Sequence, residues 1–171
     1  MMPAPEQRGP AAMTPEAVRA AFAAFPSGVV AIAAEVDETH QVMVASSFTV
    51  GVSLDPPLVT AAVQRSSSTW RMLRAAPRIG VSVLGETHLG QVRQLASSDR
   101  ARRLEGVGVT TTPGRAVLLD RAPLWMECSV HGEHRAGDHD IVVFRVEELE
   151  LDLSRYPLLW HRSTVEALSS R

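Results

Sequence analysis

Runs of β-branched and other apolar residues, separated by short polar or glycine-containing stretches, dominate the chain from residue 28 onward. Runs of this kind, bounded by turn residues, are typical of strands. The two longest, residues 123–134 and 139–151, are joined by a short connection in which Gly137 and Asp138 favour a turn. We therefore expect a long antiparallel pair there. The other predicted strands are residues 28–36, 41–48, 57–63, 78–84, 107–112 and 157–162, with a turn and hairpin over 113–120.

Helical periodicity is confined to a few short segments. In residues 14–25, Thr14 can cap a helix, and Val18, Phe22 and Phe25 recur at helical spacing on one face. Two further short helices are predicted over residues 67–76 and 87–98, followed by a charged segment, 99–106. Many strands joined by hairpins, with few helices between them, predict a mainly β antiparallel barrel rather than a doubly wound α/β sheet.

Composition and charge narrow the function classes. A chain of 171 residues with 45% hydrophobic residues suggests one domain, over residues 13–171, preceded by a disordered tail over 1–12. The net charge of −2 argues against a general nucleic-acid binder. No segment resembles a signal peptide or a membrane span, and a single cysteine, Cys128, fits a reducing compartment. The cytoplasm is therefore the expected location.

A run of hydroxyl side chains at the start of the second predicted helix suggests an anion site. Residues 65–69 read Arg-Ser-Ser-Ser-Thr, and hydroxyls and free N–H groups at a helix start can bind a phosphate. Plain helix capping is the alternative, although one serine would be enough for a cap. The chain has neither the GxGxxG fingerprint nor a P-loop, so a nucleotide would have to be held in another way.

A second group of hydroxyls lies where the strand 41–48 ends. Ser46, Ser47 and Thr49 follow an apolar run, and the backbone groups that leave the ladder there need partners. They could bond the edge of a flat polar ring, or they could form a serine turn that ends the strand. Phe48 is read equally well as a core residue or as a stacking partner.

Several segments, in this order, resemble the flavin reductase-like family of FMN-binding split barrels. The resemblance runs from about Phe22 to about His161 and includes FPSGVVAIAA, MVASSFTVGVSLDPPLV, RSSSTWRML, PLWMECSV and GDHDIVVFRV. It implies an antiparallel Greek-key split β-barrel with a few short helices, assembled as a homodimer. It also implies an NAD(P)H:flavin oxidoreductase that uses NADH or NADPH to reduce FMN or FAD for a separate monooxygenase.

The resemblance assigns roles to residues. The nicotinamide side of the flavin is expected near Asp138 and His139, where His139 could donate a hydrogen bond to the carboxamide or stabilise the reduced, anionic ring. The positions expected to hold the flavin are Ser27, Gly28, Ala45, Ser46, Ser47, Phe48, Thr49, Arg65, Ser66, Ser67, Ser68, Thr69, Arg103 and Trp160. The family commonly has Thr at position 27, an aromatic residue at 104 and Tyr at 160, where this chain has Ser27, Leu104 and Trp160.

Other functions remain open from the sequence. The same site could belong to a flavin-binding electron carrier or sensor that does not react with nicotinamide, or to a barrel that has lost flavin and serves as an assembly module. One of Arg100, Arg102 and Arg103 could help neutralise a flavin or nicotinamide phosphate, and a solvated charged face is the alternative. No metal site is predicted, because in HGEH (131–134) a strand would place His134 on the opposite face from His131 and Glu133.

Overall fold

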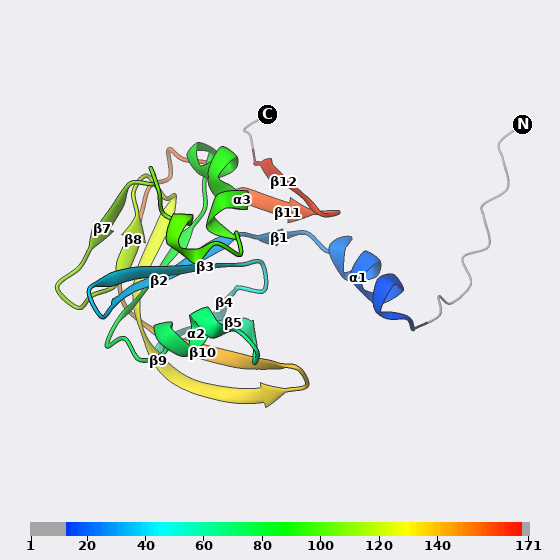
Figure 1. Cartoon of the computed structure of the whole chain (residues 1–171), viewed down its shortest axis with the longest axis horizontal. Helices are drawn as coiled ribbons and strands as arrows, with labels where there is room; N and C mark the ends of the chain where they lie inside the picture. Colours follow the sequence, from blue (N-terminus) through cyan, green and yellow to red (C-terminus); the bar gives the residue numbers. More distant parts are fainter. Residues whose placement is uncertain (1–12, 169–171) are drawn as a thin grey trace, which may run out of the picture.

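The computed structural model describes residues 13–168, so the tail predicted over 1–12 lies outside the described residues, as does 169–171. The largest sheet of the described chain is a seven-stranded antiparallel sheet that curls around a core (Figure 1). In spatial order its strands are β3 (Thr39–Ala45), β2 (Val30–Val36), β6 (Ile79–Val83), β9 (Leu124–Ala136), β10 (His139–Leu151), β5 (Pro57–Gln64) and β4 (Thr49–Leu54). The predicted mainly β, antiparallel architecture is confirmed.

The long pair β9–β10 lies at the centre of the sheet. Its strands pair up to a two-residue turn, in which Gly137 has a φ of 66°, and register shifts interrupt the pairing between Val143 and Phe144 and between Val146 and Glu148. Alternate residues of β10, Val142, Phe144 and Val146, are buried, as a strand with one face on the core requires. The rings of Phe144 and Trp70 meet edge to face at 5.8 Å between centroids. Trp70 thereby fixes the short helix α2 (Ser68–Leu73) against the sheet.

Smaller elements close the rest of the molecule. A second sheet contains β1 (Ser27–Gly28), β11 (Leu158–His161) and β12 (Thr164–Ala167), and β7 (Val109–Thr111) pairs with β8 (Val117–Leu119). The predicted helix over 87–98 is a 3₁₀ turn, η1 (Glu86–Gln91), followed by α3 (Val92–Leu95), and the charged segment contains η2 (Arg100–Arg102). Within residues 13–168, no helix is both long and apolar enough to cross a membrane.

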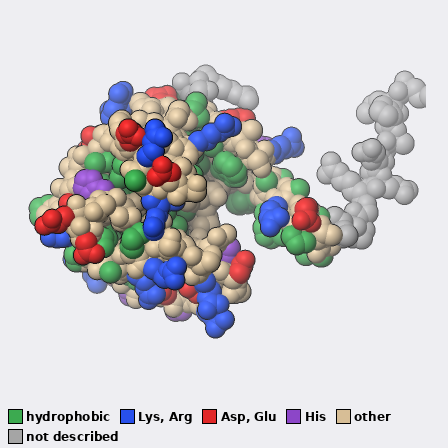
Figure 2. All heavy atoms as spheres, viewed as in Figure 1, with side chains coloured by type: hydrophobic (Ala, Val, Ile, Leu, Met, Phe, Trp, Pro, Cys, Tyr) green, Lys and Arg blue, Asp and Glu red, His purple; other side chains and the backbone are tan. Residues whose placement is uncertain are grey.

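The first helix, α1 (Pro15–Ala23), stands away from the barrel, to which β1 connects it (Figure 1). Its start follows the prediction, because Thr14 Oγ1 accepts a hydrogen bond from the Ala17 N–H at 3.2 Å. Its apolar face, however, is not covered within the chain. No residue of α1 is buried, and Phe22 and Phe25 are each 75% exposed. Figure 2 shows hydrophobic side chains on this projecting helix, apart from the main body.

The strand β4 was not predicted. The pattern over residues 49–54 has no buried face, since Val50, Val52 and Leu54 are all exposed. A register shift between Thr49 and Ser53 interrupts its pairing with β5, and Gly51 has a φ of 74° within that shift. The strand lies at one edge of the sheet, and its apolar side chains face outward.

Candidate functional site

A cleft of about 480 Å³ lies between α1, β1, β11 and the segment that joins β3 to β4. It brings together six of the positions predicted to hold a flavin, which come from three separate parts of the chain. These are Ser27, Ser46, Ser47, Phe48, Thr49 and Trp160. The antiparallel pairing of β1 with β11 sets Ser27 opposite Trp160, which explains how residues so distant in sequence share one wall. Gly28 pairs with Leu159 and has open space where a Cβ would stand.

The hydroxyls at the end of β3 divide into two kinds. Ser47 Oγ donates to the Ala62 carbonyl at 2.8 Å and accepts from the Ala62 N–H at 3.1 Å, so this side chain replaces a backbone partner for β5. In the described part of the chain, the hydroxyls of Ser46 and Thr49 make no such bond, and both are exposed at the cleft. Ser46 and Thr49 are therefore the hydroxyls available to a ligand, and Ser47 supports them.

Two of the predicted positions near the cleft differ in their surroundings. Ala45 is buried, with 8% of its surface exposed, and packs in the barrel core rather than lining the cleft. Phe48 is half-buried, packs against the same core and also lines the cleft. It therefore combines the two alternatives that the sequence left open.

The serine-rich loop 65–69 lies between the end of β5 and α2. Ser67 caps α2, because its Oγ accepts from the Trp70 N–H at 3.1 Å. Ser66 and Ser68 are exposed, and Ser68 Oγ accepts from Arg100 Nη1 at 3.2 Å. Arg65 is exposed as well, with its Nε 3.9 Å from an Asp140 carboxylate oxygen. Because α2 has only six residues, hydroxyls and guanidinium groups, more than the helix dipole, give this loop its capacity for anions.

The side chain of Arg103 joins this loop to two other segments of the chain by hydrogen bonds. Its Nη1 donates to the Val42 carbonyl at 2.7 Å and to Thr69 Oγ1 at 3.1 Å, and its Nε donates to the Ser97 carbonyl at 2.6 Å. Burial, and secondarily the nearby Arg100, lower the pKa of Arg103. Thr69 is buried, and its hydroxyl is used in this contact. Within residues 13–168, only Nη2 of Arg103 remains without a protein acceptor.

Asp138 and His139 lie at the turn between β9 and β10, beside the serine-rich loop. His139 is paired with Gln64, and the Arg65 N–H donates to the Asp138 carbonyl at 3.1 Å. His139 Nδ1 lies 2.7 Å from the Asp138 carboxylate. A carboxylate only accepts, so Nδ1 carries the proton and Nε2 points elsewhere. This hydrogen bond from His139 lowers the pKa of Asp138. Neither residue lines the cleft beside Ser46 within a single chain.

Sequence reasoning missed several residues that the structure brings to these sites. Arg100 was grouped with other charged residues of an exposed segment, yet it reaches Ser68. Arg19, Phe22 and Ser163 line the cleft but come from segments without a recognisable motif. The position of α1 next to β1 and β11 places Arg19 and Phe22 there, and the turn between β11 and β12 places Ser163 there.

The comparisons with known proteins agree with this arrangement. Residues 22–169 match the model of the family described as flavin reductase like domain, and the chain belongs to that family. A flavin reductase of Pseudomonas putida is 33% identical over 152 residues, which is 88% of each chain. The reductase component of 4-hydroxyphenylacetate 3-monooxygenase from Thermus thermophilus is 34% identical over 145 residues, 85% of this chain and 91% of the relative.

Solved structures show the same fold. The NADH:FAD oxidoreductase SgcE6 of Streptomyces globisporus, in complex with NAD and FAD fragments, superposes with a TM-score of 0.82 at 27% identity. The superposition covers 89% of this chain and 91% of that one. The predicted split-barrel fold and family are therefore confirmed.

Proposed function

We propose that this protein is an NAD(P)H:flavin oxidoreductase that reduces FMN or FAD by hydride transfer and supplies the reduced flavin to a separate monooxygenase. The observation that carries the proposal is the pairing of two sites along β3 and β5. One is a cleft at which, in the part of the chain that the structure describes, the Ser46 and Thr49 hydroxyls have no hydrogen-bond partner, and the other is the loop of Ser66 and Ser68 with Arg100. A flavin nucleotide has a polar ring edge and a phosphate, which fit these two sites. The relatives named as flavin reductases support the same reading.

In this proposal the chain binds and orients rather than supplying acid–base groups. When bound, the flavin would supply the redox chemistry, in which a hydride would pass from the nicotinamide to the flavin ring and the nicotinamide would be oxidised. The hydroxyls of Ser46 and Thr49 bond the ring edge or the ribityl chain, and Phe48 and Trp160 form the apolar walls that exclude water. Ser66, Ser68, Arg65 and Arg100 hold the phosphate. Proximity of the two rings accounts for much of the rate.

His139 has an orienting and electrostatic role in the proposal. Asp138 fixes its Nδ1–H, so Nε2 is directed away and can donate, when protonated, to a nicotinamide carboxamide or to negative charge on the reduced ring. Because His139 does not line the cleft within one chain, this role requires that the turn of one protomer lies near the cleft of its partner.

We infer that the protein is a homodimer for this reason and because apolar surface is left uncovered. Phe22 and Phe25 are 75% exposed, and Leu54, on the edge strand β4, is 88% exposed. An exposed edge strand with apolar side chains favours association, as do large exposed aromatic residues. Light scattering at micromolar concentration is expected to give the mass of two chains, and a monomer would contradict the inference.

The steady-state assay tests the enzyme directly. Purified protein is mixed with NADH or NADPH and with FMN or FAD in excess, and oxidation of the nicotinamide is followed. Turnover of the free flavin pool is expected. The proposal would be refuted if the nicotinamide were not oxidised with any of the four pairs of nicotinamide and flavin. A tightly bound yellow flavin that NADH reduces slowly, without reduction of the pool, would favour the electron carrier or sensor instead.

We also place the protein in the cytoplasm. The one cysteine is free and buried, and burial raises its pKa to about 12. A buried thiol of this kind requires no oxidising compartment. Cell fractionation that recovered the native protein from an extracytoplasmic compartment would contradict this placement.

A further inference from the structure

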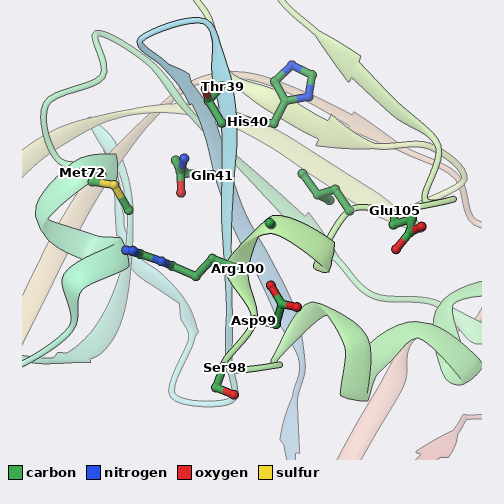
Figure 3. Close-up of a pocket in the computed structure, with 10 residues that line it drawn as sticks. Thr39, His40, Gln41, Met72, Ser98, Asp99, Arg100 and Glu105 are labelled. Carbon is green, nitrogen blue, oxygen red and sulfur yellow. The ribbon is translucent and has the colours of Figure 1, made fainter.

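A second open cleft, of about 870 Å³, shares no lining residue with the cleft beside Ser46. It is bounded by α2, by the start of β3 and by residues 98–105. Its volume lies within the range of about 300–1,000 Å³ that small-molecule sites occupy. Of the residues that line it, the function proposed above uses only Arg100. Figure 3 shows Met72 and Gln41 facing this space, with Arg100 reaching across toward α2.

The lining of this cleft matches an adenosine group. Met72 and Leu104 provide apolar surface for a flat ring, and a methionine sulfur packs well against aromatic rings. The amide of Gln41 can pair with the edge of adenine through one donor and one acceptor. Asp99 lines the cleft, and within residues 13–168 its carboxylate has no hydrogen-bond partner and does not cap η2. A carboxylate of this kind can accept hydrogen bonds from the hydroxyls of a ribose.

The charges of the cleft disfavour a further phosphate. Arg100 is directed to Ser68 at 3.2 Å, and Glu105 at the rim is paired with Arg102 at 3.1 Å. Asp99 therefore leaves the interior of the cleft neutral to negative. A ribose with free hydroxyls fits this environment, and a ribose 2′-phosphate does not.

Arg100 connects the cleft to the flavin site. It lines the cleft and bonds Ser68 of the loop assigned to the flavin phosphate. In addition, β3 runs from Gln41 in this cleft to Ser46 in the other. At about 3.3 Å per residue the two positions are roughly 17 Å apart. A ligand in which adenosine monophosphate continues directly from a flavin phosphate would occupy both clefts and the loop between them.

On the basis of the proposed function, we propose that the cleft of Gln41, Met72, Asp99 and Leu104 binds the adenosine half of FAD, so that FAD rather than FMN is the preferred flavin. The adenosine half of the nicotinamide dinucleotide has the same chemistry. The assignment to FAD rests on the continuity through Arg100 and Ser68. The experiment must therefore separate the two sources.

The test is equilibrium binding of FAD and FMN, measured by calorimetry, to the wild type and three variants. Ala101→Trp places a large side chain at an exposed position that lines the cleft, and Asp99→Asn removes the negative acceptor with little change of shape. Ala75→Trp, at an exposed position outside the cleft, is the matched control. Thermal unfolding verifies that each variant is folded.

We expect the wild type to bind FAD about tenfold or more tightly than FMN, equivalent to about 1.4 kcal/mol. Ala101→Trp should lower the affinity for FAD about tenfold, Asp99→Asn should lower it severalfold, and neither should change the affinity for FMN. The control should change neither flavin. Equal affinities for FAD and FMN in the wild type, or an equal loss of both in the cleft variants, would overturn the inference.

Two further readouts separate the possible failures. If Ala101→Trp raises the KM for NADH with FMN as acceptor and leaves the FAD-to-FMN ratio unchanged, the cleft serves the nicotinamide dinucleotide and the assignment to FAD is wrong. Steady-state turnover distinguishes the rest. Normal NADH oxidation with no FAD preference refutes only this inference. A selective FAD effect in a protein that never oxidises a nicotinamide supports the adenosine site and refutes the proposed enzyme.

Discussion

Replacing Arg103 with lysine should destabilise the fold, because the guanidinium joins three segments of the chain. It bonds the carbonyls of Ser97 and Val42 and the hydroxyl of Thr69. A lysine keeps the charge but cannot reach all three acceptors from one nitrogen. If one bond survives, two are lost. At roughly 1.5 kcal/mol for each hydrogen bond to a charged group, the free energy of unfolding should fall by about 3 kcal/mol.

The measurement is the unfolding midpoint of Arg103→Lys without ligand. For a chain of this size, a loss of that magnitude lowers Tm by about 6–12 °C. Arg102→Lys is the control, since the same change is made one residue earlier at a side chain that is 72% exposed and that, among the described residues, is paired only with Glu105. Its midpoint should not change. A wild-type Tm for Arg103→Lys, together with an affinity for FMN reduced about tenfold, would show that Arg103 acts mainly on the ligand and would refute this reasoning.

Three other outcomes follow from the contacts described above. Ser47→Ala should lower the free energy of unfolding by about 1–2 kcal/mol in urea titrations, because two hydrogen bonds to Ala62 are lost, whereas Ser46→Ala should have no effect; equal effects would contradict the distinction. Burial lowers the pKa of His88 from 6.5, so the folded state binds fewer protons than the unfolded state just below that pH. The neutral, buried His88 should therefore stabilise the wild type fully above about pH 6.5, and the free energy of unfolding should fall as the pH falls below that value. For His88→Asn the free energy of unfolding should depend less on pH below 6.5, and an identical pH dependence of the two proteins would refute the role of His88. Cys128, whose pKa burial raises to about 12, should resist thiol reagents at neutral pH until the protein is unfolded by urea, and rapid labelling of the native protein would contradict its burial.

The long strands could be predicted from sequence because their pattern and turn chemistry agree. The buried positions of β10 alternate, and Gly137 and Asp138 mark the turn. Two strands were not predicted, for a physical reason. In β4, Val50, Val52 and Leu54 face away from the core, and β12 has only one residue that is not exposed, Val165. Neither segment therefore shows a period that a one-chain core would impose.

The candidate site could be predicted at the level of segments but not of individual side chains. The serine-rich loop and the end of β3 were both identified, yet the sequence does not show that the hydroxyl of Ser47 is hydrogen-bonded to the backbone of Ala62. That contact depends on the position of β5, fifteen residues away. Likewise, the order of arginines in 100–103 does not show that Arg100 reaches Ser68 while Arg103 reaches Val42. The turn geometry of η2 separates them.

The proposed function requires that this chain hold a flavin and a nicotinamide so that a hydride can pass between them. Its most direct test is an anaerobic reaction of the protein, in catalytic amount, with flavin and an equal amount of NADH. The visible absorption of the flavin is expected to bleach at the rate at which NADH is consumed, in equal amounts, and Ser46→Ala combined with Thr49→Val should slow both together. A flavin that stays oxidised with wild-type protein and either FMN or FAD, for NADPH as for NADH, would contradict the account.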